Sequence, residues 1–220
     1  MDGPTVPNHL KPDLSLEIPL WKKGVSYVAG IDEAGRGAIA GPVAAAAVIL
    51  PTEPSLMESL WGVNDSKKMS PKSRDFWAGE LKEICLDYGV GYASHNEIDR
   101  IGIAPATHLA IGRALKKLEL KPEHLLIDYL VLKGCNIPQT SITKGDTISL
   151  SIAAASIIAK TSRDALMRQR SKKYPGYNFD HNKGYGTLFH RNALASLGAC
   201  PIHRKSFKIR GIDCENTADP

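Results

Sequence analysis

The sequence has 220 residues, of which 43% are hydrophobic and 23% are charged, and its formal net charge at pH 7 is +5. This length and apolar content suffice for a buried core and favour one globular domain. No apolar run approaches the roughly 20 residues that cross a bilayer, so we expect no membrane association. The N-terminus resembles neither a secretory signal nor an acid-poor transit peptide, which favours a cytoplasmic protein.

The cysteines and histidines exclude two common kinds of site. No Cys-x-x-Cys pair and no His-Glu-x-x-His motif occurs, so neither a disulfide framework nor a zinc site is expected. Free thiols in a reducing compartment fit this sparse usage. The four cysteines are Cys85, Cys135, Cys200 and Cys214.

In chain order, the hydrophobic pattern predicts strands first and then strands alternating with helices. Residues 1–24 contain four prolines and are expected to form an irregular lead-in, whereas residues 211–220 are expected to be a disordered tail. Between them, short apolar runs predict strands over residues 27–32, 43–50, 90–94, 124–128 and 141–143. Helical spacing predicts helices over residues 70–84, 104–118, 150–171 and 188–197. This order is typical of an α/β or α+β fold with helices packed against a sheet.

Two adjacent acids end the first predicted strand. Asp32 and Glu33 precede a turn that contains Gly35, Arg36 and Gly37. Carboxylate oxygens suit a hard divalent cation, and glycines let a substrate approach the main chain closely. The pattern therefore favours a metal site beside a substrate, with a simple turn cap as the alternative.

The same glycines also fit a dinucleotide-binding fingerprint. Gly35, Gly37 and Ala40 match Gly-x-Gly-x-x-Ala after a strand, and Glu53 lies near the expected acidic position. That fingerprint needs the glycines to open a helix, whereas residues 43–50 predict a returning strand. Two acids directly before a pyrophosphate site would also repel it, so we expect no dinucleotide.

Two more acids join the candidate site. Asp128 ends its predicted strand as Asp32 does, and paired strands would bring the two backbones to about 4.8 Å. Asp164 lies on the apolar stripe of a predicted helix, with a salt bridge to Lys160 as the alternative. Clustered carboxylates repel one another unless cations compensate them, and two ions among such acids support in-line displacement at a phosphodiester. The acids indicate a metal-dependent nuclease.

Basic residues concentrate toward the C-terminus. Residues 160–210 contain 12 Lys and Arg residues but only two acids. Tyr185 lies between two glycines close to Lys183, which favours stacking on a sugar or base; a core tyrosine in a tight turn is the alternative. Lys67 and Lys144 lie in polar loops that either contact phosphates or are plain turns.

Together these motifs resemble those of the ribonuclease HII family, the type 2 ribonucleases H. The resemblance runs from Val28 to about Phe207. Its motifs are Asp-Glu-Ala-Gly-Arg-Gly at 32–37, Asp-Ser-Lys-Lys at 65–68, Glu-Ile-Asp-Arg at 97–100, Leu-Ile-Asp at 126–128, Lys-Gly-Asp at 144–146, Ser-Ile-Ala-Ala-Ala-Ser-Ile at 151–157, Ala-Lys at 159–160, Arg-Asp at 163–164, His-Asn-Lys-Gly-Tyr-Gly-Thr at 181–187 and Pro-Ile-His-Arg-Lys-Ser-Phe at 201–207.

The resemblance implies a ribonuclease H-like α/β fold over a catalytic domain of residues 25–210. This fold has a mixed five-stranded sheet flanked by helices and a helical C-terminal part. The implied activity, dependent on Mg²⁺ or Mn²⁺, is hydrolysis of RNA in RNA/DNA hybrids and cleavage 5′ to single ribonucleotides in duplex DNA. Cleavage would leave 3′-hydroxyl and 5′-phosphate ends.

The resemblance also implies roles for individual residues. By position, the metal-binding acids would be Asp32, Glu33, Asp128 and Asp164. The backbone of Gly35, Arg36 and Gly37 would sense the ribose 2′-hydroxyl, which distinguishes RNA from DNA, and Tyr185 would stack on the neighbouring deoxyribose. Lys67, Lys144 and Lys183 are the candidate phosphate contacts.

The sequence departs from the family pattern in two places. Ala38 stands where the family usually has proline, and the bulky residues 129–132 follow Asp128 where small polar residues are common. Adjacent strand residues point to opposite faces, so Glu33 can reach the same metals as Asp32 only if the chain leaves strand geometry there. We expect a monomer that removes ribonucleotides from DNA, with a non-catalytic nucleic-acid-binding module as the alternative.

Overall fold

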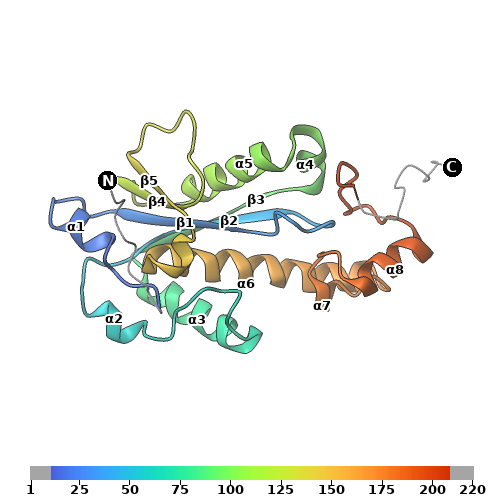
Figure 1. The fold of residues 1–220 in the computed structure, drawn as a ribbon, viewed down its shortest axis with the longest axis horizontal. Helices are drawn as coiled ribbons and strands as arrows, with labels where there is room; N and C mark the ends of the chain where they lie inside the picture. The colour runs from blue at the N-terminus through green and yellow to red at the C-terminus, as the bar shows by residue number, and fades with distance from the viewer. Residues whose placement is uncertain (1–10, 209–220) are drawn as a thin grey trace, which may run out of the picture. The chain divides into compact units, whose positions relative to one another are not determined.

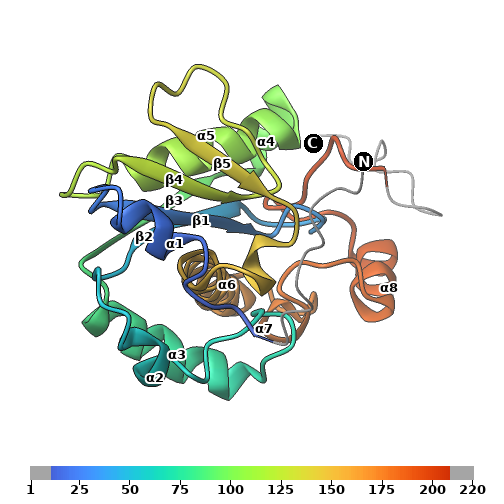
Figure 2. The ribbon, with the colours of Figure 1, turned by 60° about the vertical axis from the view of Figure 1, so that its left-hand side comes forward.

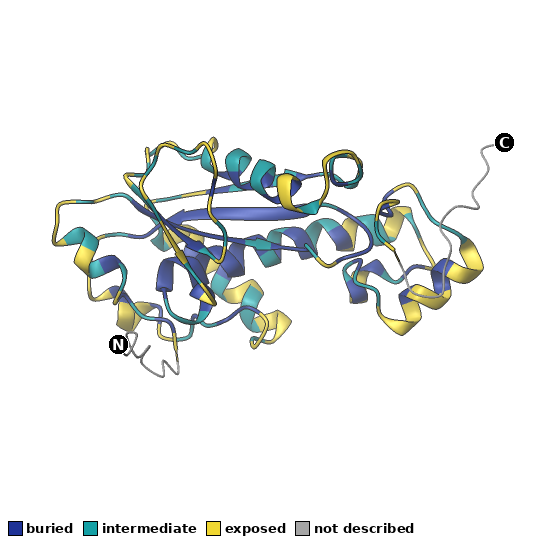
Figure 3. Cartoon of the chain, turned by 45° about the horizontal axis from the view of Figure 1, so that its top comes forward, coloured by how far each residue is buried: buried dark blue, intermediate teal, exposed yellow. Residues whose placement is uncertain are grey.

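The computed structural model describes residues 11–208 and contains a five-stranded sheet in the order β3-β2-β1-β4-β5 (Figure 1). The strands are β1 (Val28–Ala34), β2 (Val43–Ile49), β3 (Asp87–Ala93), β4 (His124–Asp128) and β5 (Gln139–Ile142). The neighbouring strands β1 and β2 are buried over almost their whole length (Figure 3). The mixed five-stranded sheet that the family resemblance implies is confirmed.

Helices flank this sheet. They are α1 (Glu17–Trp21), α2 (Leu56–Ser59), α3 (Pro71–Ile84), α4 (His95–Ile101), α5 (Ile103–Leu115), the 3-10 turn η1 (Gly145–Thr147), α6 (Leu150–Lys173), α7 (Phe179–Asn182) and α8 (Leu188–Leu197). Helix α6 has 24 residues, which is long enough to cross a membrane, but it is not apolar enough. Across residues 11–208, no helix is suited to cross a membrane.

The chain groups into two compact units. The first comprises Met1–Asp32, Ala47–Tyr88 and Glu119–Ile157, and the second comprises Glu33–Ala46, Gly89–Leu118 and Ile158–Pro220. The chain passes between them within β1, β2, β3 and α6, and once more between α5 and β4. A single catalytic domain over residues 25–210 stays a prediction.

In the first unit, β4 pairs in parallel with β1 on one side and with β5 on the other (Figure 2). The first turn of α6 lies directly against β1, because a Cβ atom on Gly30 would lie 2.1 Å from the backbone carbon of Ser151. Only glycine permits an approach this close. Gly30 therefore sets the separation between β1 and the start of α6.

The lead-in is not wholly irregular, because it contains α1. Glu17 is fully buried, and its Oε1 atom accepts hydrogen bonds from the Ser149 hydroxyl and from the backbone and hydroxyl of Ser151. Burial raises the pKa of the Glu17 carboxyl. The residues of the lead-in that pack against Val28, Leu126 and Ile152 are Leu16, Leu20 and Trp21. Residues 1–10 of the lead-in and the expected tail at 211–220 lie outside the described residues.

In the second unit, α5 packs on the second half of β3. A Cβ atom on Gly89 would lie 2.2 Å from the carbonyl oxygen of Ala114, and one on Gly91 would lie 2.1 Å from that of Ala110. The alternating glycines therefore let the helix rest on the strand backbone. A separate core of this unit includes Ile39, Ala40, Met167, Tyr177, Phe179, Ala193, Leu194 and Ile202.

Local capping signals account for where several helices begin. Ser70 accepts a hydrogen bond from the backbone of Ser73 and Pro71 opens α3, as predicted. Helix α8 also has its predicted bounds. Helix α4 is absent from the sequence prediction, although Ser94 and Glu97 form a reciprocal capping box at its start. That box is the signal that could have located it.

Candidate active site

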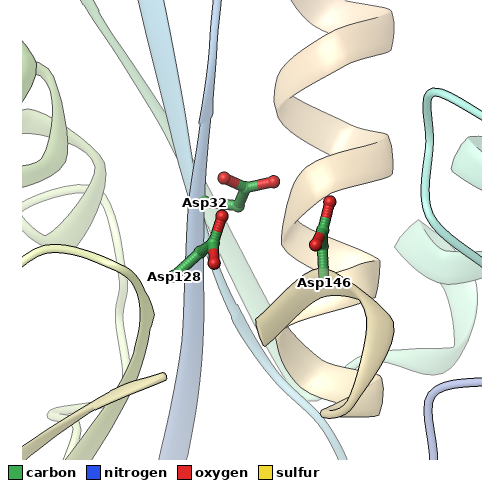
Figure 4. A group of neighbouring side chains, drawn as sticks. All are labelled: Asp32, Asp128 and Asp146. Carbon is green, nitrogen blue, oxygen red and sulfur yellow. The ribbon is translucent and has the colours of Figure 1, made fainter. Parts of the chain in front are cut away.

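Three carboxylates meet in the first unit, those of Asp32, Asp128 and Asp146 (Figure 4). One oxygen of each lies within 4.8 Å of the others, and Asp32 and Asp146 are buried while Asp128 is half-buried. Three hard oxygen donors at this spacing can hold a divalent cation. The structure thus brings together two of the acids that the sequence singles out and adds a third.

Strand pairing positions the first two acids. Ile31 aligns with Ile127 in the parallel pair of β1 and β4, so the next residue of each strand lies at the same end of the sheet. Asp128 is the last residue of β4, and its Oδ1 atom accepts a hydrogen bond of 2.8 Å from the backbone N–H of Gly145. That bond connects the strand end to η1.

Asp146 comes from η1, outside any strand or long helix. Lys144 precedes the turn in the left-handed conformation, with φ of 58°. A Cβ atom on Gly145 would lie 2.6 Å from the Cδ1 atom of Ile152, so the turn packs tightly on α6. The Lys-Gly-Asp motif at 144–146 is among those that resemble the family, but no pattern in the sequence assigns its acid to the metal site.

Lys67 is the cation beside these acids. Its Nζ atom lies 3.1 Å from Oδ2 of Asp146, although the side chain is 72% exposed. Burial lowers the pKa of Lys67, but Asp146, with Asp32 and Asp65, raises it more, so the net direction is upward. Lys67 stays charged and can meet a second anion from its exposed side.

The loop that carries Lys67 is anchored on the first unit. The hydroxyls of Ser66 and Ser156 form a buried hydrogen bond of 2.8 Å, which ties the loop to α6. Asp65 accepts a 2.8 Å hydrogen bond from the backbone of Lys67 and shapes the turn. The ammonium group therefore projects from a fixed backbone.

The other two predicted acids, Glu33 and Asp164, belong to the second unit. The bend on which a metal role of Glu33 depends is absent, because β1 continues to Ala34, and the Glu33 carboxylate pairs with Arg36 at 3.1 Å. The Asp164 carboxylate pairs with Lys160 at 2.9 Å, which is the salt bridge weighed as the alternative. Their role as metal ligands stays a prediction.

Arg204 supports the backbone of the glycine-rich turn, Gly35 to Gly37, in the second unit. It is almost fully buried and donates to the carbonyl oxygens of Gly35, Arg36 and Gly41 at 2.7, 2.8 and 3.0 Å. Burial, with a smaller contribution from Arg163, lowers the pKa of Arg204 to about 9. The C=O of a trans peptide points opposite to the following N–H, so the N–H groups of Arg36 and Gly37 point away from this guanidinium.

Arg163 supports the same turn and connects it to a second loop. It donates to the carbonyl oxygens of Pro42, Ala40 and Lys183 at 2.8, 3.2 and 2.9 Å. Gly35 has φ of 91°, and a Cβ atom on it would lie 1.9 Å from Nε of Arg163. The sequence therefore needs glycine at position 35 for both conformation and space.

Tyr185 lies in that second loop beside two cations. The Nζ atom of Lys160 lies 5.2 Å and the Cζ atom of Arg163 lies 5.3 Å from its ring centroid. Its backbone N–H donates to Asn182, and its carbonyl oxygen accepts from Thr187. The ring is only half-buried and is not a core tyrosine.

The remaining two lysines occupy turns. Lys183 ends α7 in the left-handed conformation, with φ of 51°, and its Nζ atom donates to the carbonyl oxygen of Asp180. Burial lowers the pKa of Lys183. Lys144 is exposed before η1. Phosphate binding by either residue stays a prediction.

Comparison with known proteins decides the family. Residues 29–210 match the family described as Ribonuclease HII. The chain is 50% identical over 198 residues to Ribonuclease HII of Synechococcus sp. (strain JA-3-3Ab), which covers 90% of this chain and 89% of that relative. The chain belongs to the ribonuclease HII family.

Two solved structures support the ribonuclease HII assignment at the level of the fold. The ribonuclease H2 of Pyrococcus horikoshii OT3 aligns with a TM-score of 0.67 and 27% identity, covering 82% of this chain and 93% of that chain. The RNase HII of Archaeoglobus fulgidus, solved as a complex with PCNA, aligns with a TM-score of 0.69 and 27% identity, covering 87% and 100%. The fold prediction is confirmed, and the chain is a ribonuclease HII-type nuclease that acts on RNA in RNA/DNA hybrids.

Proposed function

We propose that the chain is an endonuclease that cuts 5′ to single ribonucleotides in duplex DNA and also cuts the RNA strand of longer hybrids. Its products would carry 3′-hydroxyl and 5′-phosphate ends, and its role would be ribonucleotide removal from DNA. The observation that carries the proposal is the cluster of Asp32, Asp128 and Asp146, since phosphodiester hydrolysis of this kind needs acids that hold cations.

The acid cluster fits Mg²⁺ or Mn²⁺. Its donors are carboxylate oxygens, and three acids within 4.8 Å repel one another strongly unless a cation compensates them. We assign Asp32, Asp128 and Asp146 to the metal. Glu33 is proposed as a further ligand, which requires the chain to leave strand geometry at Glu33 when the metal binds. Asp146 takes the role that the sequence prediction gave to Asp164. When bound, such ions activate water and stabilise the leaving oxygen of an in-line displacement.

Recognition of the ribose is assigned to the glycine-rich turn. Arg204 binds the carbonyl oxygens of Gly35 and Arg36, which leaves the N–H groups of Arg36 and Gly37 directed away from it. An N–H group can donate to the ribose 2′-hydroxyl, which deoxyribose lacks. The turn would therefore distinguish RNA from DNA with its backbone.

Tyr185 and the lysines complete the substrate contacts in this proposal. The half-buried Tyr185 ring would stack on the neighbouring deoxyribose, and Lys67 would contact a phosphate through its exposed ammonium group. Lys144 and Lys183 are proposed as further phosphate contacts. We also propose that the protein works as a monomer in the cytoplasm on RNA/DNA hybrids and ribonucleotide-containing duplex DNA.

The test is cleavage of a DNA duplex that contains one ribonucleotide, with Mg²⁺ or Mn²⁺. We expect a cut on the 5′ side of the ribonucleotide, a 3′-hydroxyl and a 5′-phosphate on the products, and no cut in an all-DNA duplex. Asp32→Asn should bind the duplex without cutting it. An uncut ribonucleotide duplex would refute the proposal, and metal-independent binding without cleavage by the unsubstituted chain would favour the non-catalytic module.

A further inference from the structure

Two histidines of the second unit form a buried pair that the proposed reaction leaves unused. His190 lies in the first turn of α8 and His203 in the loop after it, and their exposures are 0% and 5%. Their Nε2 atoms lie 3.0 Å apart. Both rings pack against Tyr177 and Phe179, with centroid separations between 5.1 and 6.4 Å. The pair is therefore enclosed by aromatic rings.

The surrounding backbone determines which nitrogen carries each proton. Nδ1 of His190 lies 2.9 Å from the carbonyl oxygen of Tyr185, which only accepts, so this nitrogen must donate. In the neutral ring, Nε2 of His190 is then an acceptor, and it takes the proton on Nε2 of His203. Nδ1 of His203 is left to accept the 2.9 Å hydrogen bond from the backbone N–H of Cys200. The Cys200 carbonyl oxygen, 3.1 Å from the same nitrogen, instead accepts a 3.0 Å hydrogen bond from the backbone N–H of His203. Two neutral rings in opposite tautomers satisfy this set of hydrogen bonds.

The chain of hydrogen bonds ends on the residue whose ring is proposed to stack on the substrate. The carbonyl oxygen of Tyr185 accepts from His190 and also from the backbone of Thr187. This oxygen belongs to the same residue as the stacking ring, so the two bonds fix the backbone from which that ring projects. A fixed backbone lowers the cost of holding the ring in its working position.

The other end of the pair is joined to the glycine-rich turn. His203 forms a β-bridge with Ala40, and the backbone N–H of Arg204 donates to the carbonyl oxygen of Ile39 at 2.9 Å. Gly41 donates to the carbonyl oxygen of Ile202 at 2.8 Å. The pair therefore spans from the loop of Tyr185 to the segment that continues the turn at Gly35 to Gly37.

The setting of both rings opposes a positive charge. Burial lowers the pKa of His190, and burial, with His190 and His95, lowers the pKa of His203 to about 4. The other titratable groups that face the pair are Cys200 and Tyr177, whose pKa values burial raises, so both stay neutral near pH 7. Burial therefore favours the neutral form of both histidines.

We infer that His190 and His203 are positioning residues that act through the Tyr185 carbonyl to hold the Tyr185 ring for the substrate. This inference rests on the proposed function, because it requires the stacking role of Tyr185. Neither histidine touches substrate or metal in this account. Their contribution is to keep the loop that carries Tyr185 in one conformation.

The first test observes the pair directly in the full chain with ¹⁵N-labelled histidine. We expect NMR to show His190 with its proton on Nδ1 and His203 with its proton on Nε2, and both rings neutral at pH 7. The same tautomer on both rings, or a protonated ring at pH 7, would overturn the inference.

The second test is a double-mutant cycle on the single-ribonucleotide duplex. His190→Leu removes both hydrogen bonds of the ring, and His190→Asn retains a donor near Nδ1, so we expect kcat/KM to fall about tenfold in the first and less in the second. Tyr185→Ala should lower kcat/KM by itself. In the Tyr185→Ala background, His190→Leu should cause no further loss, because the pair acts through that ring.

The outcomes separate the inference from the proposed function. Losses that multiply in the double variant would show that His190 acts elsewhere and would overturn the inference alone. Wild-type activity of Tyr185→Ala would instead remove the stacking role, and the positioning role with it. Urea unfolding of each variant identifies any loss caused by unfolding, and the NMR test on the unsubstituted chain decides the state of the pair in that case.

Discussion

In the first unit, the carboxylates of Asp32, Asp128 and Asp146 approach within 4.8 Å of one another. In the second unit, the guanidinium groups of Arg163 and Arg204 are buried and contact the backbone. The acids face each other. The arginines instead direct six hydrogen bonds to backbone carbonyl oxygens. Both regions concentrate charge of one sign, yet only the first leaves it available to a ligand.

This difference indicates separate roles for the carboxylates and the arginines. Carbonyl oxygens carry partial negative charge and satisfy a guanidinium without neutralising it, so the arginines fix the shape of a loop. Acids that face acids repel one another, and Lys67, which pairs with Asp146, supplies a single positive charge to the three carboxylates, so the cluster also suits a metal cation. Substitutions should therefore lower activity at the acids without lowering stability, and should lower stability at the arginine-supported turn.

The largest expected effect separates Asp146 from Asp164. Asp146→Asn removes a proposed metal ligand, so we expect activity on the ribonucleotide duplex to fall by about 1,000-fold, or several kcal/mol, with unfolding stability unchanged or raised. Asp164→Asn removes an ion pair with Lys160 and should retain activity within about tenfold. Steady-state cleavage and urea unfolding measure both. The reverse ranking would restore Asp164 as the ligand.

The next effect tests the turn with two neighbouring glycines. Gly35→Ala places a side chain at φ of 91° and against the buried Arg163, so we expect a loss of about 2–4 kcal/mol in unfolding free energy. Gly37→Ala meets nothing within 4 Å among the described residues and should be stable, but should lower cleavage if the ribose approaches this backbone. Equal stability of the two variants would contradict the account of the turn.

A smaller effect is the pH dependence that His203 imposes on the second unit. Its folded pKa of about 4 lies below the unfolded value of about 6.5, so the unfolded chain takes up the proton first as the pH falls. Its contribution is complete above about pH 6.5 and is lost between there and about pH 4. We expect on the order of 1–2 kcal/mol more loss in the parent chain than in His203→Gln, by urea unfolding at pH 7 and pH 5. Equal losses would contradict this.

The smallest expected effect lies beside the acid cluster. Tyr129 follows Asp128 with φ of 62° and is 64% exposed, so it is a bulky residue in left-handed geometry with little packing to lose. Tyr129→Asn should raise the unfolding free energy by up to about 1 kcal/mol, because asparagine tolerates this conformation. The exposed Val131 lacks a positive φ, so Val131→Asn is the matched control and should show no gain. A gain in both variants would show that it comes from removing an exposed apolar side chain and not from relief of the backbone at φ of 62°.

Local patterns predicted part of the site. Asp32 and Asp128 each follow an apolar run, and parallel pairing brings such strand ends together, so their proximity could be expected. Asp146 could not be found this way, because its turn is placed by contacts with Asp128 and Ile152 rather than by its own pattern. The resemblance to the family located the motif that contains Asp146 without assigning the acid.

The arginines show the second limit of sequence reasoning. Arg163 and Arg204 belong to the basic C-terminal stretch, yet both point inward to carbonyl oxygens. A sequence shows that a charge is present but not which way its side chain points. The direction depends on contacts between segments more than 100 residues apart, such as that between Arg204 and Gly35.

The central claim is that Asp32, Asp128 and Asp146 hold the metal, and calorimetric titration of Mn²⁺ into the full chain measures it without a reaction. We expect saturable binding in the unsubstituted chain, binding weakened at least about tenfold in Asp146→Asn, and unchanged binding in Asp164→Asn. Unchanged binding in Asp146→Asn, with weakened binding in Asp164→Asn, would contradict the account.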